Sequence, residues 1–188
     1  DALLEGLADS GVRVALYDRA SGEPTLQTVG AAVELGRSAG VDVVLGIGGG
    51  SAMDTAKAAA GVIPNAGRVR DYLEGVGTAK ITADPLPFIA APTTAGTGSE
   101  LTKNAVVMSK EDKFKVSIRD DRMMARVAVV DPELTVSVPA DVTAASGMDA
   151  ICQLIESFTT ALANPMCDAL ALYHTPRAME ALRHAYDD

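Results

Sequence analysis

The sequence predicts an α/β fold with a mostly parallel sheet, followed by a helical part. In the first part of the chain, short β-rich runs alternate with alanine-rich runs of helical periodicity, which is typical of βα units. After Pro132, two long stretches of helical periodicity follow one another with no strand between them. A glycine-rich loop at residues 46–57 joins a predicted strand to a predicted helix and is the most informative segment.

The first elements of the predicted sheet lie before and around this loop. Residues 12–17 are predicted to form a strand because they are rich in β-forming side chains. A helix is expected over residues 28–39, where apolar side chains recur at helical spacing, and Gly40 ends it. Residues 41–47 are a nearly continuous apolar run, which predicts a buried strand, and residues 51–62 form the next helix.

Further strands are predicted in the middle of the chain. Residues 87–91 form a buried strand, and residues 127–130 form another. Residues 105–109 and 114–118 flank a short charged segment, which predicts an antiparallel hairpin.

The change of pattern near Pro139 predicts two domains. Helices are expected over residues 142–162 and 168–186. We therefore expect an α/β domain over residues 1–138 and the start of a helical domain over residues 139–188. The chain lacks an initiator methionine and stops just after a helical pattern, so we expect both domains to be truncated parts of a longer chain.

The composition excludes several classes of protein. The 188 residues include 16 Lys and Arg against 25 Asp and Glu, a net charge of −9 that repels nucleic acid. With 48% hydrophobic and 22% charged residues, the chain is too apolar to be disordered. No apolar run is long enough to span a membrane. The two cysteines lack CxxC spacing, which favours a reducing, cytoplasmic location.

The glycine loop, GIGGGSAMDTAK at residues 46–57, is a candidate anion site. Glycines let the backbone approach a ligand closely, and the helix start offers free N–H groups with a partial positive charge. A simpler alternative is a capped helix after a tight turn, because Ser51 with Asp54 three residues later resembles a capping box. The spacing differs from the Rossmann GxGxxG pattern, which implies a different mode of dinucleotide binding.

A second polar loop, PTTAGTGSE at residues 92–100, follows the predicted strand at residues 87–91. Its hydroxyl and backbone groups can donate hydrogen bonds to a phosphate or a ribose without adding charge. Loops at the carboxyl ends of parallel strands line the crevice where ligands bind in open α/β sheets. Two such loops at successive strand ends favour a nucleotide site over two ordinary turns.

Four motifs occur in order along the chain. They are GGGS with Asp54 and Lys57, PTTAGTGSE at residues 92–100, DPELT at residues 131–135 and SGMDA at residues 146–150. Together they resemble the iron-containing (group III) alcohol dehydrogenase family over essentially the whole chain, which corresponds to the middle of a typical member. The resemblance implies a dehydroquinate-synthase-like fold: a parallel-sheet dinucleotide-binding domain followed by the start of an all-helical domain.

The resemblance implies that the chain binds NAD or NADP. In the family, the glycine loop wraps the pyrophosphate, the threonine loop contacts the cofactor, and later positions lie near the nicotinamide and its ribose. The matching residues here are Gly49, Gly50, Ser51, Asp54, Thr93, Thr94, Thr97, Ser99, Asn104, Lys115 and Leu134. For Lys115, a solvated charge on a strand is the simpler alternative. Glu23 stands where the family usually has Asn, so that contact is not carried over.

The resemblance also implies a divalent metal, iron or zinc, bound by Asp149, a residue four positions later and two histidines beyond residue 188. The later residue here is Gln153, which shares a helix face with Asp149 and is a weaker ligand than histidine. The metal could bind through Asp149 and the distal histidines only, Gln153 could bind directly, or the site could hold no metal. His174 and His184 are expected to be surface residues.

The implied function is that of an NAD(P)-dependent alcohol dehydrogenase or aldehyde reductase. The cofactor supplies the hydride, a metal polarises the carbonyl of a small-molecule substrate, and copies of the chain form a homo-oligomer such as a dimer. No catalytic acid or base is identified in this chain. One alternative is a dehydroquinate-synthase-like lyase. Such an enzyme needs a cluster of basic residues for its substrate, whereas the basic residues of this chain are scattered. A metal-free nucleotide-binding protein without catalysis is another.

Overall fold

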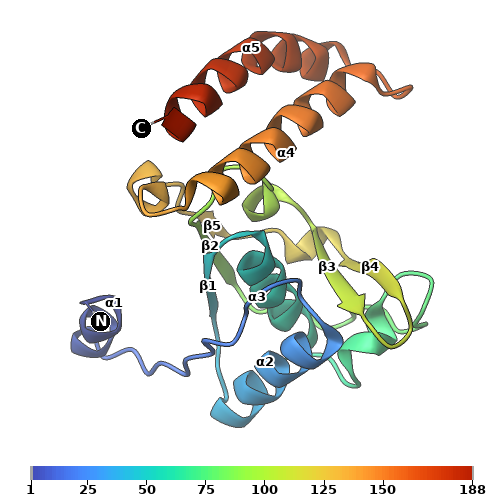
Figure 1. The fold of residues 1–188 in the computed structure, drawn as a ribbon. Coiled ribbons are helices and arrows are strands. Elements are labelled where there is room, and N and C mark those ends of the chain that lie inside the picture. Colours follow the sequence, from blue (N-terminus) through green and yellow to red (C-terminus); the bar gives the residue numbers. More distant parts are fainter. Residues whose placement is uncertain (1, 188) are drawn as a thin grey trace.

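The structure is a computed structural model that describes residues 2–187. Its centre is a three-stranded parallel sheet in the order β1–β2–β5, made of β1 (Val44–Gly48), β2 (Phe88–Pro92) and β5 (Val127–Ala128). Helix α3 (Gly50–Val62) lies between this sheet and a two-stranded hairpin, and α2 (Leu26–Ala39) packs beside α3 (Figure 1). The predicted fold class is confirmed.

The register of the parallel sheet brings two loops together. Strands β1 and β2 pair from Val44 opposite Phe88 to Gly48 opposite Pro92. Because parallel strands have their carboxyl ends at the same edge of a sheet, the loops that follow Gly48 and Pro92 begin side by side. The polypeptide therefore places the glycine loop next to the threonine loop.

Helix α3 has more buried residues than any other helix in the described part of the chain, and most of its side chains are small. Gly46 of β1 faces it so closely that a Cβ atom there would lie 2.8 Å from the Cβ of Ala56. On the sheet side, Met53 and Ala60 form a buried cluster with β2 residues. On the other side, α3 joins a larger apolar cluster with α2 and the hairpin, which includes Val29, Val33, Ala58, Ala59, Val62, Ala105, Val107 and Ile118.

The antiparallel hairpin matches the sequence pattern. Strands β3 (Asn104–Ser109) and β4 (Phe114–Arg119) are antiparallel, so the predicted hairpin is confirmed. Its turn contains Lys113 with a φ of 54°. Short 3-10 turns connect the elements at Val69–Tyr72, Ser99–Leu101, Asp121–Met123 and Pro132–Thr135.

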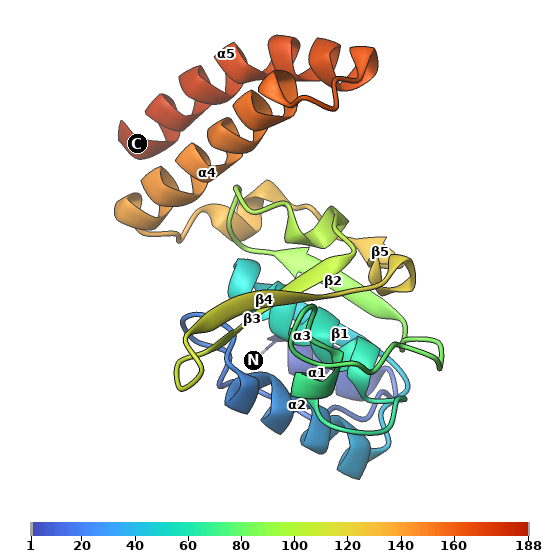
Figure 2. The ribbon, with the colours of Figure 1, turned by 90° about the vertical axis from the view of Figure 1, so that its right-hand side faces the viewer.

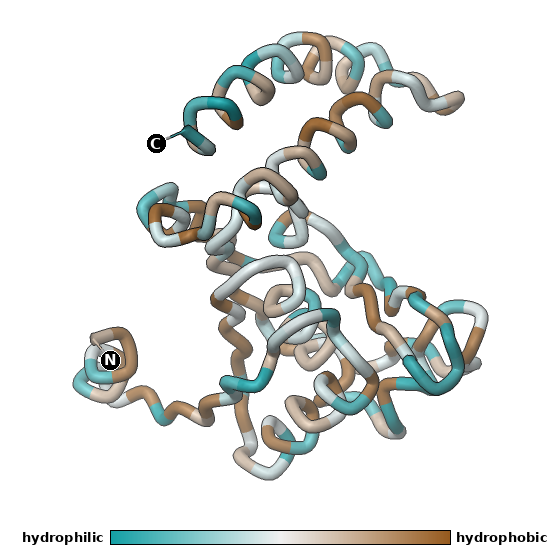
Figure 3. Tube along the Cα trace, viewed as in Figure 1, coloured by the Kyte–Doolittle hydropathy of each residue, from teal (hydrophilic) through white to brown (hydrophobic). Residues whose placement is uncertain are grey.

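Two long helices, α4 (Ala140–Thr159) and α5 (Pro165–Asp187), pack against each other above the sheet (Figure 2). They approach closely at Gly147, where a Cβ atom would lie 2.4 Å from Cδ1 of Leu182. Many of their apolar side chains are exposed among the described residues, and Figure 3 marks the hydrophobic positions of these helices in brown. The exposed apolar side chains on these helices include Val142, Met148, Ile155, Phe158, Met166, Leu170, Leu172 and Met179.

The prediction of a strand at residues 12–17 is wrong. These residues follow α1 (Ala2–Asp9) and pair with no strand in the described part of the chain. The side chains of Val12, Val14 and Leu16 are 43%, 46% and 59% exposed, and Figure 1 shows this segment and α1 standing apart from the core. A strand needs a neighbour to satisfy its backbone N–H and C=O groups, and local β propensity does not supply one.

The helices also bear on membrane insertion. Across residues 2–187, none of them is both long enough and apolar enough to cross a bilayer.

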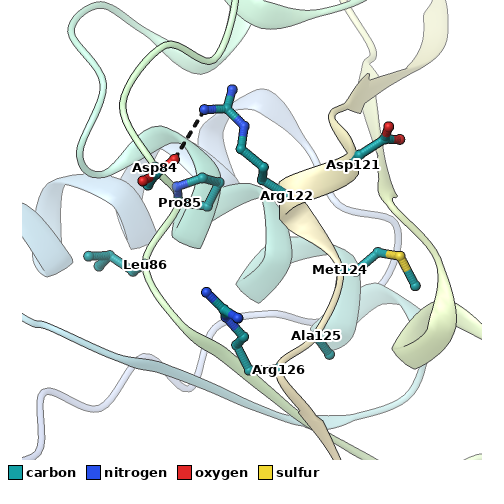
Figure 4. Close-up of a pocket in the computed structure, with 8 residues that line it drawn as sticks. All are labelled: Asp84, Pro85, Leu86, Asp121, Arg122, Met124, Ala125 and Arg126. Carbon is teal, nitrogen blue, oxygen red and sulfur yellow. Dashed lines mark hydrogen bonds and ion pairs between the residues drawn. The ribbon is translucent and has the colours of Figure 1, made fainter.

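Arg122 joins its own turn, at residues 120–122, to the loop at residues 81–84 that precedes β2. Its Nε and Nη2 atoms lie 2.8 and 3.0 Å from the carboxylate oxygens of Asp120, and Nη2 also donates to the backbone oxygen of Ile81 at 2.6 Å. Nη1 lies 3.2 Å from Asp84, the ion pair drawn in Figure 4. The hydrogen bond from Arg122 holds the pKa of Asp120 below its usual value.

Replacing Asp120 with Asn is expected to destabilise the protein near neutral pH and to have less effect in acid. Asn keeps an oxygen that can accept the backbone N–H of Arg122, as Asp120 does, but loses the charge that binds the guanidinium. Because the pKa of Asp120 is lower in the folded state, its carboxylate stabilises the fold above about pH 4, and this contribution is lost as the pH falls through the folded pKa.

The measurement is urea denaturation of native protein and Asp120→Asn at several pH values. The difference between their free energies of unfolding should be constant near neutrality and shrink below about pH 4. A difference that stays the same throughout the acid range would contradict this account of the Arg122 contact.

Candidate functional site

The glycine loop makes an abrupt turn from β1 into α3. Strand β1 ends at Gly48 and the helix begins at Gly50, so Gly49 alone joins them. Gly48 has a φ of +143°, a conformation that side chains disfavour, and a Cβ atom there would lie 2.7 Å from the Cβ of Ala52. A residue with a side chain at this position would force the strand and the helix apart.

The first N–H groups of α3 have no partner within the helix. Gly49 is the N-cap and makes no side-chain capping bond, and the first bond into the helix is from Met53 N–H to the oxygen of Gly49 at 3.0 Å. The capping box considered for Ser51 and Asp54 is therefore not formed, because the carboxylate of Asp54 bonds elsewhere. Helix N–H groups without partners, together with the helix dipole, form an anion site.

The threonine loop lies directly against this helix start. The backbone N–H of Thr93 donates to the oxygen of Gly48 at 2.9 Å, which extends the pairing of β1 and β2. A Cβ atom at Gly49 would lie 3.4 Å from Cγ2 and Oγ1 of Thr94, and one at Gly50 would lie 2.7 Å from Cγ2 of Thr97. The two glycines thus let two threonine side chains pack directly against the start of α3, and we call this junction of the two loops the cradle.

Asp54 and Ser99 are bonded to each other. The hydroxyl of Ser99, which is buried, donates to Oδ1 of Asp54 at 2.5 Å. The other carboxylate oxygen of Asp54 accepts the backbone N–H of Val106 at 2.9 Å. These two predicted cofactor residues hold the threonine loop and β3 onto α3, while a direct contact with the cofactor stays a prediction for both.

Lys57 lies one turn after Asp54 and its side chain is completely buried. Its Nζ atom donates to the backbone oxygen of Ser99 at 2.5 Å and lies 3.7 Å from Oδ1 of Asp54. Burial lowers the pKa of the Lys57 ammonium group, and the neighbouring Asp54 carboxylate opposes that shift. The sequence motif included Lys57 without a role, although a single cation in an alanine-rich run was a signal that it has buried partners.

The other predicted cofactor residues lie farther along the chain. The backbone oxygen of Asn104, at the start of β3, accepts from Nζ of Lys57 at 2.9 Å. Lys115 on β4 is half exposed and forms an ion pair with Glu23, with 2.8 Å between Nζ and Oε2. Leu134 lies exposed in the 3-10 turn after β5. The structure joins Asn104 to the loops through Lys57, whereas Lys115 is engaged by Glu23.

Helix α4 brings Asp149 and Gln153 to the threonine loop. Nε2 of Gln153 donates to Oδ2 of Asp149 at 2.9 Å and to the backbone oxygen of Gly96 at 3.3 Å. A Cβ atom at Gly96 would lie 2.3 Å from the backbone oxygen of Ser146, so the loop and the helix are in close contact. The two predicted metal ligands therefore lie beside the candidate cofactor site.

These residues supply only part of a metal site. Asp149 is exposed and offers a carboxylate, but Gln153 turns its amide nitrogen towards that carboxylate. Within residues 2–187, no group of three or more His, Cys, Asp or Glu side chains could hold an ion. His174 and His184 are exposed on α5, as expected. A metal at Asp149 would need further ligands from outside the described residues.

One surface hollow of about 380 Å³ lies elsewhere. Figure 4 shows the residues around it, including Pro85, Leu86 and Arg126. These residues precede β2 and β5, so the hollow is at the amino ends of the strands, opposite the glycine loop. It does not contribute to the candidate cofactor site.

Known proteins match the chain in sequence and in fold. The model of the family described as iron-containing alcohol dehydrogenase matches residues 1–132. The chain is 42% identical, over 98% of its length and 46% of the relative, to long-chain-alcohol dehydrogenase 1 of Geobacillus thermodenitrificans. It is 39% identical, over 97% of its length and 47% of the relative, to alcohol dehydrogenase 4 of Saccharomyces cerevisiae.

A solved structure also matches the chain in fold and sequence. The sulfoacetaldehyde reductase of Bifidobacterium kashiwanohense in complex with NAD+ is 36% identical, with a TM-score of 0.90 over the whole chain and 49% of that protein. The chain spans about half the length of the curated relatives it matches. The resemblance predicted from four motifs is confirmed, and the chain belongs to the iron-containing alcohol dehydrogenase family.

Proposed function

We propose that the protein is an NAD-dependent alcohol dehydrogenase or aldehyde reductase that acts on a small alcohol or aldehyde. The observation that carries this proposal is the start of α3 after Gly49, where the glycine loop and the threonine loop meet. The names of relatives support it: one is an NAD-dependent methanol dehydrogenase of Bacillus methanolicus, and the solved reductase was complexed with NAD+. When bound, the nicotinamide supplies and accepts the hydride.

The residues of the two loops would bind and orient the cofactor. The backbone N–H groups at Gly50 and Ser51 would donate to the pyrophosphate at the helix start. The hydroxyl groups of Thr94 and Thr97 lie beside the same glycines and would contact the phosphate or the ribose. Lys115 would reach the cofactor only by leaving Glu23, which makes it the least supported of the predicted contacts.

Asp149 would supply one carboxylate ligand to a divalent metal. Gln153 donates hydrogen bonds to both Asp149 and the backbone oxygen of Gly96, which places Asp149 next to the loop that would hold the cofactor. A bound iron or zinc ion would act as a Lewis acid on the substrate oxygen. Gln153 would orient Asp149 by its hydrogen bond, in agreement with the possibility that the ion binds without it.

The names of the relatives favour this activity over the alternatives. The relatives described above are alcohol dehydrogenases and a reductase, and none of these names describes a lyase. Four further points stay predictions: binding of NADP, binding of a zinc ion, assembly into a homo-oligomer and a cytoplasmic location.

The direct test of the proposed function is an assay of the full-length gene product. We expect NAD+ to be reduced in the presence of primary alcohols, and NADH to be oxidised with the matching aldehydes, after supplementation with Fe(II) or Zn(II). Absorbance of NADH measures both directions, and parallel reactions with NADP+ and NADPH measure cofactor preference. Binding of neither cofactor, together with no turnover of any alcohol, would overturn the proposal.

Replacing Gly50 with Ala is expected to weaken NADH binding at least about tenfold, or about 1.4 kcal/mol. The new Cβ atom would lie 2.7 Å from Cγ2 of Thr97, so it would push the threonine side chain away from the start of α3. Fluorescence titration with NADH measures the dissociation constant. Gly30→Ala is the matched control, because no atom lies within 4 Å of a Cβ there on helix α2.

The control should bind NADH as the native protein does and gain about 0.5 to 1 kcal/mol in stability, since Ala favours the helix. Equal dissociation constants for Gly50→Ala and Gly30→Ala would argue against the cradle as the cofactor site.

Replacing Asp149 with Asn is expected to remove most of the bound metal, because the amide lacks the charge of a carboxylate ligand. Elemental analysis of the purified full-length gene product measures the metal content, with Glu156→Gln, another exposed carboxylate of α4, as the control. Gln153→His should raise metal affinity, since imidazole is the stronger ligand. Unchanged metal content in Asp149→Asn would exclude Asp149 as a ligand.

A further inference from the structure

Lys57 is a buried cation that the proposed function does not use. Its side chain has no exposed surface, although it projects from a helix rich in alanine. Its Nζ atom lies within hydrogen-bond distance of four oxygen atoms, all of them in residues 99–104. These are the backbone oxygen and Oγ of Ser99, Oγ1 of Thr102 and the backbone oxygen of Asn104, at 2.5, 3.1, 2.9 and 2.9 Å.

Asp54 completes the contact as the acidic partner. The hydroxyl of Ser99 accepts from Lys57 and donates to Asp54, so one side chain bridges the two charges. Oδ2 of Asp54 binds the N–H of Val106. Together, Asp54 and Lys57 hold the chain from residue 99 to residue 106 against the first two turns of α3.

These contacts of Asp54 and Lys57 lie at the far end of the threonine loop. At its near end, the loop is fixed by the hydrogen bond from Thr93 to Gly48. Between these ends, Thr94 and Thr97 lie against Gly49 and Gly50. The position of both threonine side chains therefore depends on where the chain is fixed at residue 99.

Burial of an ammonium group costs free energy, which its partners must offset. Residues with apolar side chains could fill the same volume without that cost. However, the oxygens of Ser99 and Asn104 need a donor that reaches them from α3, and a long cationic side chain with three N–H groups meets that need.

We propose that Lys57 is a positioning residue for the cofactor. It acts with Asp54 and Ser99 to hold the threonine loop at the distance from the glycine loop that the dinucleotide requires. This role rests on the proposed function. Lys57 does not contact the reacting atoms. Its loss would let the loop shift away from the glycine loop, weaken cofactor binding and leave the chemical step largely unchanged.

The test compares Lys57→Met with Arg37→Met in the full-length gene product. Arg37 is a matched control because it also donates to backbone oxygens, those of Val62, Ile63 and Asn65, but at the opposite end of α3. Both variants lose a cation that fixes α3 to another segment, which is residues 99–104 for Lys57 and α2 for Arg37. Only Lys57→Met should disturb the loop beside the glycines.

For Lys57→Met we expect the NADH dissociation constant and the KM for NAD+ to rise at least about tenfold, with kcat at saturating NAD+ changed less than about threefold. Hydrogen exchange of the amides in residues 93–102 should become faster. Arg37→Met should lower the thermal midpoint but leave the dissociation constant, the KM and exchange in this loop unchanged.

Three outcomes would overturn the proposal. If native protein binds NADH and Lys57→Met binds it equally well, Lys57 has only a structural role and the proposed function stands. If both variants lose affinity equally, the effect is one of general stability. If native protein binds no cofactor, the proposed function and the positioning role fail together.

A second variant tests the positioning role if Lys57→Met does not fold. Ser99→Ala removes the hydroxyl bridge between Lys57 and Asp54 but leaves the backbone oxygen that Lys57 binds. It should raise the NADH dissociation constant by about threefold and speed amide exchange in the same loop. Native affinity and native exchange in Ser99→Ala would count against the role of this cluster.

Discussion

The close packing of helix α3 against the sheet is the constraint on which the rest of the structure depends. At Gly46 the strand and the helix are so near that even a methyl group would lie 2.8 Å from Ala56. This proximity lets the chain pass from β1 to α3 through Gly49 alone. A larger residue at Gly46 or Ala56 would move the helix outward, and its N–H groups would no longer lie beside the threonine loop.

The same helix fixes the second loop through its polar side chains. The apolar residues of α3 pack on the sheet, α2 and the hairpin, while Asp54 and Lys57 emerge where residues 99–106 cross it. Because Asp54 and Lys57 carry opposite charges and share Ser99 as a bridge, the buried charge is balanced locally. The helix thus defines both sides of the candidate cofactor site, one by its backbone and one by its side chains.

The sequence allowed most of the fold to be predicted, because most elements have a local pattern. Helical periodicity located α2, α3 and both C-terminal helices, and two short runs around a charged segment located the hairpin. Residues 12–17 have an equally good local pattern but form no strand, because pairing depends on a neighbour that propensity cannot reveal. The glycine and threonine loops were predictable as a pair. The hydrogen bond between Ser99 and Asp54 was not, because these residues are 45 positions apart and meet only in the folded chain.

The buried position of Lys57 also clarifies how an acidic protein can bind an anionic cofactor. The net charge of −9 does not attract a pyrophosphate, and the motif's own cation is directed into the protein, where four oxygens surround it. Attraction at the glycine loop must then come from the N–H groups and dipole of α3, which act only over the first turn. Such a site depends on the spacing of the two loops more than on charge, and that spacing is what the Lys57 contacts maintain.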